Sequence, residues 1–97
     1  MAKKIIWTKP AQKSRKAILD FWTQHNKSNT YSLKLHLMFI EHTKLLLTYP
    51  LIGIRSDFEN YRVLLVRDYN IYYRIEEDAI IIVGIRDARQ NPQDFKL

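Results

Sequence analysis

The 97-residue sequence has no cysteine, only two glycines, and no apolar run long enough to cross a membrane. Without cysteine the chain cannot form a disulfide or a thiolate metal site, a composition typical of a reducing compartment. Two isolated glycines, Gly53 and Gly84, do not make a glycine-rich phosphate loop. The start, MAKKIIWTK, has three consecutive apolar residues, too few for the core of a signal peptide, so we expect a cytoplasmic protein.

Hydrophobic residues make up 46% of the chain, enough for the core of one domain over residues 1–97. The net charge of +6 is unevenly distributed. Residues 1–48 carry nine basic and two acidic residues, and eight of those bases are lysine. Residues 49–97 carry seven basic and eight acidic residues, and six of those bases are arginine. A basic chain favours an anionic partner such as a nucleic acid, the ribosome or an acidic peptide.

Two helices are predicted in the first half of the chain. After a short strand over residues 3–8, Thr8 can cap a helix that begins near Pro10. One stripe of this helix is apolar, and we expect it to pack on the core: Ala11, Ile18, Phe21, Trp22 and His25.

The second helix, about residues 30–49, is apolar on two sides. One stripe contains Tyr31, Leu35, Met38, Phe39, His42, Leu45, Leu46 and Tyr49. Nearly opposite lie Leu33, Leu37, Ile40 and Leu47. A helix with two apolar sides is packed on two sides, here on the sheet and on either the first helix or a second protein.

Three strands are predicted in the second half, over residues 61–67, 69–75 and 79–86. Their connections are short enough only for antiparallel hairpins. With the first strand, the order is β-α-α-β-β-β. The sequence therefore predicts an α+β fold, in which a helical hairpin packs on one face of a mostly antiparallel four-stranded sheet.

Alternation along the strands divides their side chains between two faces. We expect Val63, Leu65, Ile71 and Ile75 to face the helices. The opposite, open face is then basic, together with the end of the last strand: Arg62, Asn70, Tyr72, Arg74, Arg86 and Arg89. This surface is either a solvated sheet face or a binding surface for anions.

Little in the sequence points to metal or acid–base chemistry. The three histidines show no metal-ligand spacing, and we expect neither a metal nor a cofactor. We expect His25 and His42, which lie on apolar stripes, to be partly buried. No histidine, lysine or glutamate on the open face is an obvious general base, so the residues favour binding over catalysis.

Three segments resemble the RelE/ParE superfamily of toxins from bacterial type II toxin–antitoxin systems. They are KIIWTKPAQKSRKAILDFW (4–22), YPLIG (49–53) and YRVLLVRDYNIYYRIEEDAIIIVGIRDARQNP (61–92). Each is largely a hydrophobic pattern, but their order, spacing and total length make the match specific over residues 4–95. The resemblance implies a small toxin that inhibits growth and is neutralised by direct binding of an antitoxin.

The resemblance leaves the target open. ParE-like members inhibit DNA gyrase, whereas RelE-like members cut mRNA in the ribosomal A site. Arg62 and Arg89 match basic residues of the ribonuclease pattern. However, Asn70 stands where an arginine is expected, and Phe95 stands where a catalytic tyrosine is expected. We therefore favour a gyrase inhibitor, with a metal-independent mRNA endoribonuclease and a non-toxic binding module as the alternatives.

The resemblance also assigns surfaces. The target-binding surface is predicted to comprise Arg62, Asn70, Tyr72, Arg74, Arg86 and Arg89. Asp87 is expected to hold one of these arginines by a bidentate pair. The antitoxin is predicted to carry an acidic wrapping segment and to dock on Leu33, Leu37, Ile40 and Leu47.

Overall fold

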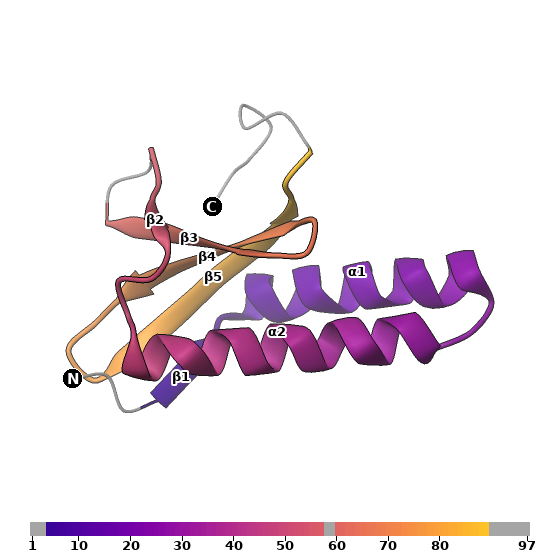
Figure 1. Cartoon of the computed structure of the whole chain (residues 1–97), viewed down its shortest axis with the longest axis horizontal. Coiled ribbons are helices and arrows are strands. Elements are labelled where there is room, and N and C mark those ends of the chain that lie inside the picture. Colours follow the sequence, from indigo (N-terminus) through magenta and orange to yellow (C-terminus); the bar gives the residue numbers. More distant parts are fainter. Residues whose placement is uncertain (1–3, 58–59, 90–97) are drawn as a thin grey trace.

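A computed structural model describes residues 4–57 and 60–89 of the chain. The described residues form, in chain order, β1 (Lys4–Trp7), α1 (Lys9–Asn26), α2 (Thr30–Thr48), β2 (Ile54–Arg55), β3 (Tyr61–Val66), β4 (Tyr69–Ile75) and β5 (Ala79–Asp87). Figure 1 shows the two helices side by side against a twisted sheet. The α+β fold predicted from the sequence is confirmed.

The sheet has the strand order β1-β5-β4-β3-β2. β1 runs parallel to β5, and the other neighbouring strands are antiparallel. The sheet has five strands where the sequence predicted four, because the two-residue strand β2 pairs with β3. A β2 of only two residues has no alternating pattern to detect, since a side-chain period of two needs several residues to be recognised.

The ends of α1 follow local sequence rules. Thr8 is the N-cap, as predicted, and its hydroxyl oxygen accepts a hydrogen bond from the backbone N–H of Ala11 at 3.2 Å. Pro10 lies in the first turn, where no N–H donor is needed. The helix ends at Asn26 because Lys27 takes the left-handed conformation, with φ 52°.

The turn between β3 and β4 sets the register of the sheet. Its two residues are Arg67 and Asp68, and Arg67 has a φ of 55°. Val66 therefore lies opposite Tyr69, and both side chains face the helices. The sequence pattern had placed Arg67 inside the strand, which shifts the pairing by one residue and exchanges the two faces of β3.

The predicted faces of β3 are consequently wrong. Leu64 packs against the core, whereas Leu65 is 60% exposed. Val63 pairs with Tyr72 on the open face. Arg62 lies opposite Tyr73 on the helix side, so it does not belong to the open face where we had predicted it.

The core lies between α2 and the helix-facing side of the sheet. Its fully or almost fully buried members are Ala11, Leu35, Phe39, Leu46, Val66, Tyr69, Ile71, Tyr73, Ile80, Ile82 and Ile85. Ile71 faces the helices as predicted, but Ile75, at the end of β4, stays largely exposed. Neither helix is long and apolar enough to cross a membrane, as far as the described residues show.

Candidate functional site

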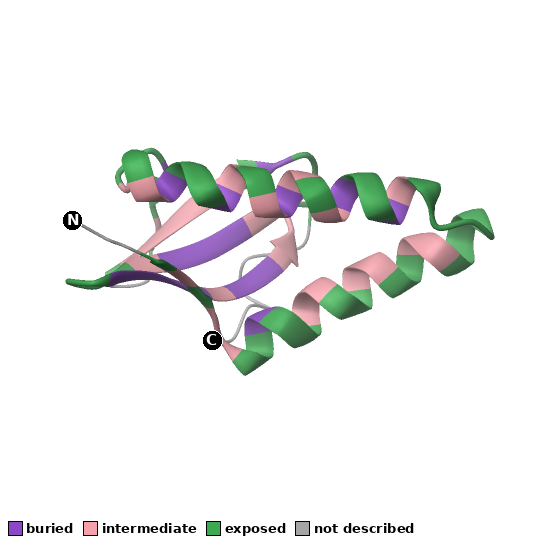
Figure 2. Cartoon of the chain, turned by 90° about the horizontal axis from the view of Figure 1, so that it is seen from below, coloured by how far each residue is buried: buried purple, intermediate pink, exposed green. Residues whose placement is uncertain are grey.

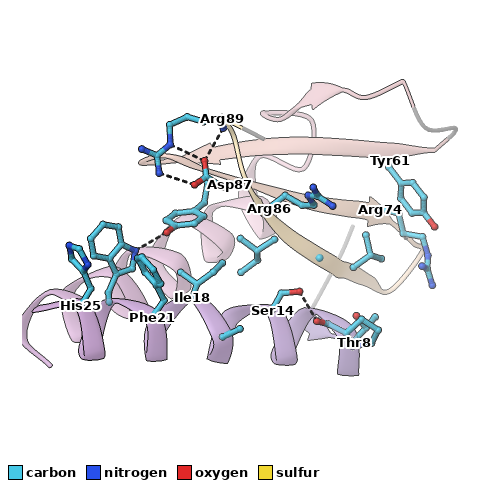
Figure 3. Close-up of a pocket in the computed structure, with 17 residues that line it drawn as sticks. Thr8, Ser14, Ile18, Phe21, His25, Tyr61, Arg74, Arg86, Asp87 and Arg89 are labelled. Atoms are coloured by element: carbon cyan, nitrogen blue, oxygen red, sulfur yellow. Dashed lines mark hydrogen bonds and ion pairs between the residues drawn. The ribbon is translucent and has the colours of Figure 1, made fainter. Parts of the chain in front are cut away.

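A groove of about 940 Å³ runs between α1 and the carboxyl end of β5 (Figure 3). We call it the α1–β5 groove. Its helix wall is mostly apolar and includes Ala17, Ile18, Phe21, Trp22 and His25. Its sheet wall is mostly polar and basic, with Tyr61, Tyr69, Arg74, Arg86, Asp87 and Arg89. An apolar wall opposite a basic wall is suited to an amphipathic partner that carries negative charge.

The groove exists because β1 is short. β1 pairs with β5 only as far as Trp7 opposite Ile82, and the chain then turns into α1 at Thr8. Among the described residues no strand pairs with β5 on that side from Val83 onward. A β-bulge at Val83 adds twist to this end of the strand. As far as the described residues show, this end of β5 lines the groove without a neighbouring strand on that side.

The helix wall is an apolar stripe that the fold buries only in part. Only Ala11 of the 18 residues of α1 is fully buried, whereas α2 buries five residues (Figure 2). Phe21 is 56% exposed, and His25 is exposed as well. We had predicted that both would pack on the core. The prediction is therefore confirmed for Ala11, Ile18 and Trp22, which are in the core or pack against it, but wrong for Phe21 and His25, which are exposed in the groove.

An aromatic cluster lines the groove along the second half of α1. The indole N–H of Trp22 donates a hydrogen bond to the Tyr69 hydroxyl at 2.7 Å (Figure 3). Phe21 packs edge-on against Trp22 and stacks on His25, with an interplanar angle of 11°. Burial raises the pKa of Tyr69, although the hydrogen bond from Trp22 opposes that shift. The hydroxyl therefore stays protonated at neutral pH.

Asp87 and Arg89 form a bidentate ion pair at the mouth of the groove. The Arg89 Nε and Nη2 atoms lie 3.0 and 2.8 Å from the two carboxylate oxygens, and the Arg89 backbone N–H donates to Oδ1 at 2.8 Å. These hydrogen bonds hold the pKa of Asp87 below its usual range and raise the pKa of Arg89. The predicted role of Asp87, holding an arginine, is confirmed for Arg89.

Two of the other predicted arginines are also engaged. Arg74 pairs with Glu76 through Nε and Oε1 at 2.7 Å, and this hydrogen bond raises the pKa of Arg74. Arg62 donates from Nη1 to the carbonyl of Gly53 at 2.8 Å. Arg62 and Arg74 both line a smaller polar hollow of about 710 Å³ next to β2. Arg62 does not line the α1–β5 groove, although the two hollows share Tyr61 and Arg74.

The remaining residues of the predicted target-binding set lie on the open face. Asn70 lies opposite Arg86 in the β4–β5 pair and opposite Leu65 in the β3–β4 pair. Tyr72 is on the same face but is almost fully buried. The structure therefore brings Arg74, Arg86 and Arg89 together along one groove and leaves Asn70 beside them on the sheet. Phe95 lies outside the described residues.

The second stripe of α2 is divided by the structure. Leu33 and Leu37 are exposed, whereas Ile40 is half-buried and Leu47 packs against the core. The first stripe is divided too, because Leu45 and Tyr49 are exposed. Only part of each predicted stripe is therefore available to a partner.

No group of three histidine or carboxylate side chains that could hold a metal ion occurs in the described parts of the chain. His42 is half-buried, as expected, with Nδ1 2.8 Å from the carbonyl of Met38. His25, in contrast, lines the groove together with Arg86 and Arg89. The sequence pattern missed this proximity because His25 and the arginines come from elements about 60 residues apart.

The family model described as "ParE toxin of type II toxin-antitoxin system, parDE" matches residues 5–92. The chain belongs to the ParE toxin family. Among curated protein sequences, none matches it significantly.

Solved structures agree with this assignment at the level of the fold. The chain is similar to a structure titled "Chromosomal ParDE TA system from P. aeruginosa", with a TM-score of 0.79 and 22% identity over 92% of this chain and 98% of the other. It is also similar to a structure of the E. coli DinJ–YafQ toxin–antitoxin complex, with a TM-score of 0.52 and 14% identity over 90% and 93% of the two chains. The ParE-type fold therefore extends over nearly the whole chain.

Proposed function

We propose that this ParE-family protein is a toxin that arrests bacterial growth by inhibiting DNA gyrase, and that a cognate antitoxin neutralises it by direct binding. The observation that carries the proposal is the family match over residues 5–92. The fold supports it too, because the chain shares its architecture with a ParDE structure over almost its full length.

The state of the arginines favours a protein target over mRNA cleavage. Cleavage through the 2′-hydroxyl needs cations around the phosphate, together with a general base and a general acid. Arg89 is held by Asp87, Arg74 by Glu76, and Arg62 by a backbone carbonyl. These bonds occupy part of the five N–H donors of each guanidinium, and the carboxylates of Asp87 and Glu76 place negative charge beside Arg89 and Arg74, where a phosphate would have to bind. Held arginines still present a fixed positive surface to an acidic protein.

The α1–β5 groove supports the proposed antitoxin. An acidic, amphipathic segment would place apolar side chains against Ile18, Phe21 and Trp22 and its carboxylates near Arg86. The edge of β5 adds backbone donors and acceptors for an extended segment. Leu33 and Leu37, exposed on α2, are a second candidate contact for the same wrapping antitoxin.

The test is to induce the protein in bacteria and follow thymidine and amino-acid incorporation in parallel. We expect DNA synthesis to stop first, and we expect purified toxin to block supercoiling by purified gyrase. Prior addition of the antitoxin should restore supercoiling. An early stop in protein synthesis with unaffected supercoiling would reject the gyrase target. Normal growth at a confirmed high abundance would indicate a non-toxic binding module.

One observation favours the alternative, ribosome-dependent cleavage of mRNA. His25 is an exposed, titratable side chain in the same groove as Arg86 and Arg89, and histidine is the commonest general base near neutral pH. Replacing it tests this role directly. If His25→Gln abolished growth arrest while antitoxin affinity was unchanged, and mRNA cleavage was lost with it, the ribonuclease function would be supported. We expect His25→Gln to remain toxic.

A further inference from the structure

The segment between α2 and β3 exposes an unusual number of large apolar side chains. Tyr49, Leu51, Ile52 and Ile54 are all more than half exposed, and Ile54 reaches 77%. Tyr49, Pro50, Leu51 and Ile52 line an almost wholly apolar hollow of about 520 Å³. We call residues 49–54 the 49–54 loop. Contiguous exposed apolar patches of this kind mark interaction sites on soluble proteins.

Hydrogen bonds to side chains of β3 and β4 hold the 49–54 loop in one conformation. The buried hydroxyl of Tyr73 donates to the carbonyl of Pro50 at 2.8 Å and accepts from the backbone N–H of Gly53 at 2.9 Å. Burial raises the pKa of Tyr73, so its proton is retained for the first of these bonds. Arg62 fastens the same loop through the carbonyl of Gly53 at 2.8 Å.

Gly53 lets the loop approach the sheet this closely. A Cβ atom at this position would lie 2.5 Å from the Tyr73 hydroxyl and 2.8 Å from the carbonyl oxygen of Val63. Three anchors therefore fix a short loop whose apolar side chains point away from the core. Fixing a surface before it binds lowers the entropy lost on association, which is how rigid loops reach high affinity.

The chemistry of the loop selects a protein partner. Its hollow has almost no polar lining, so phosphate groups would find no donors there. A second copy of this chain is disfavoured, because two chains that each carry a net charge of +6 repel one another. With a net charge of +6 on each chain, the favoured partner presents an apolar cleft with an acidic rim.

The 49–54 loop is separate from the α1–β5 groove. The apolar hollow of the loop shares no lining residue with the groove. Figure 1 places the loop beyond the carboxyl end of α2, at the end of the helical hairpin opposite the α1–α2 connection. We propose that the toxin holds its protein target through the 49–54 loop, whereas the antitoxin occupies the groove. This inference rests on the proposed function, since it requires a protein target.

The test compares Leu51→Glu with Leu65→Glu. Both leucines are exposed to a similar extent, at 65% and 60%, but Leu65 lies on the open face of β3 outside the loop. We expect Leu51→Glu to weaken inhibition of purified gyrase at least about tenfold and to abolish growth arrest at equal abundance. We expect Leu65→Glu to act like the parent. Both should bind the antitoxin and unfold thermally as the parent does.

The outcomes separate the two proposals. If Leu51→Glu arrests growth as fast as the parent, or if both variants lose toxicity equally, the 49–54 loop is not the target contact. If the parent spares gyrase but only Leu51→Glu loses growth arrest, gyrase is the wrong target and the loop still holds another protein. If the parent cleaves translated mRNA, or does not arrest growth at all, the inference of a protein target fails.

Discussion

At the scale of single residues, the arginines predicted to form one surface have different structural roles. Arg62 is turned inward and fastens the 49–54 loop, whereas Arg89 is 69% exposed at the mouth of the groove. The difference comes from strand register, because Arg62 lies opposite the buried Tyr73. A substitution of Arg62 therefore reports on loop geometry, and a substitution of Arg89 reports on the charge of the surface.

We predict that Arg89→Ala slows growth arrest while leaving the free energy of unfolding close to that of the parent, because exposed ion pairs contribute little to stability. Lys16→Ala, which breaks an exposed Lys16–Asp20 pair on α1, is the matched control and should stay fully toxic. Quantifying growth after induction at equal protein abundance checks this. Full toxicity of Arg89→Ala would remove Arg89 from the target-binding surface.

The same variant changes the titration of Asp87. Arg89 depresses the Asp87 pKa in the folded state, so the pair contributes stability above the unfolded pKa of about 4 and loses it as the pH falls through the folded pKa. In Arg89→Ala the pKa of Asp87 should rise toward its ordinary value. An NMR titration of the carboxyl carbon measures this, and an unchanged pKa would show that the ion pair does not persist in solution.

Tyr73→Phe removes one hydroxyl and leaves the Pro50 carbonyl and the Gly53 N–H without their partner. We expect a loss of about 1–3 kcal/mol in the free energy of unfolding, since buried donors and acceptors are left unsatisfied. If the 49–54 loop contacts the target, toxicity should fall by more than antitoxin affinity does. Denaturant unfolding and calorimetry with the antitoxin make the comparison. Equal losses of the two would show a merely structural role.

At the scale of elements, the helices and strands could largely be predicted because local rules set them. Thr8 and Pro10 begin α1, and alternating apolar residues mark β4. The faces of β3 could not be predicted, because one left-handed residue, Arg67, decides the register and arginine is not a typical turn residue. The exposure of Phe21 and His25 on α1 could not be predicted for another reason: periodicity shows that one side of a helix is apolar, but not which of its residues are covered.

Substitutions of Lys27 test whether α1 ends in a left-handed residue. It has a φ of 52°, and the backbone N–H of the following Ser28 donates to the carbonyl of Thr23 at 3.1 Å, as in a Schellman-type helix end. Glycine adopts this conformation without the strain caused by a Cβ atom. Lys27→Gly should therefore stabilise the protein by about 0.5–1 kcal/mol, whereas Lys27→Ala should not. Thermal unfolding of the two variants checks the difference, and equal stabilities would argue against the left-handed cap.

At the scale of the whole molecule, the chain presents two surfaces of different character. The α1–β5 groove combines an apolar helix wall with arginines, whereas the 49–54 loop is apolar and convex around a small hollow. The sequence predicted the arginines at the end of β5 but not the groove, which forms only when α1 packs beside the part of β5 that β1 does not pair with. The packing of α1 beside β5 depends on contacts between residues far apart in the chain, and no local sequence pattern encodes it.

The basic wall and the apolar wall of the groove should affect different rate constants of antitoxin binding. The arginines and the net charge of +6 steer an acidic partner, so we expect the association rate to fall at least about tenfold between low salt and 0.5 M NaCl. Phe21→Ser removes apolar area from the helix wall without changing charge. It should therefore speed dissociation about tenfold or more and leave the salt dependence of association unchanged.

Leu37→Ser tests the second candidate contact on α2 in the same measurement, because Leu37 is exposed to nearly the same extent as Phe21, at 58% against 56%, but lies outside the groove. Stopped-flow binding of the purified antitoxin to the three proteins gives both rates. If the groove carries most of the affinity, only Phe21→Ser dissociates faster. Faster dissociation of Leu37→Ser with a normal Phe21→Ser would move the antitoxin to the outer stripe of α2. The exposed Phe21 in the groove would then lack an occupant.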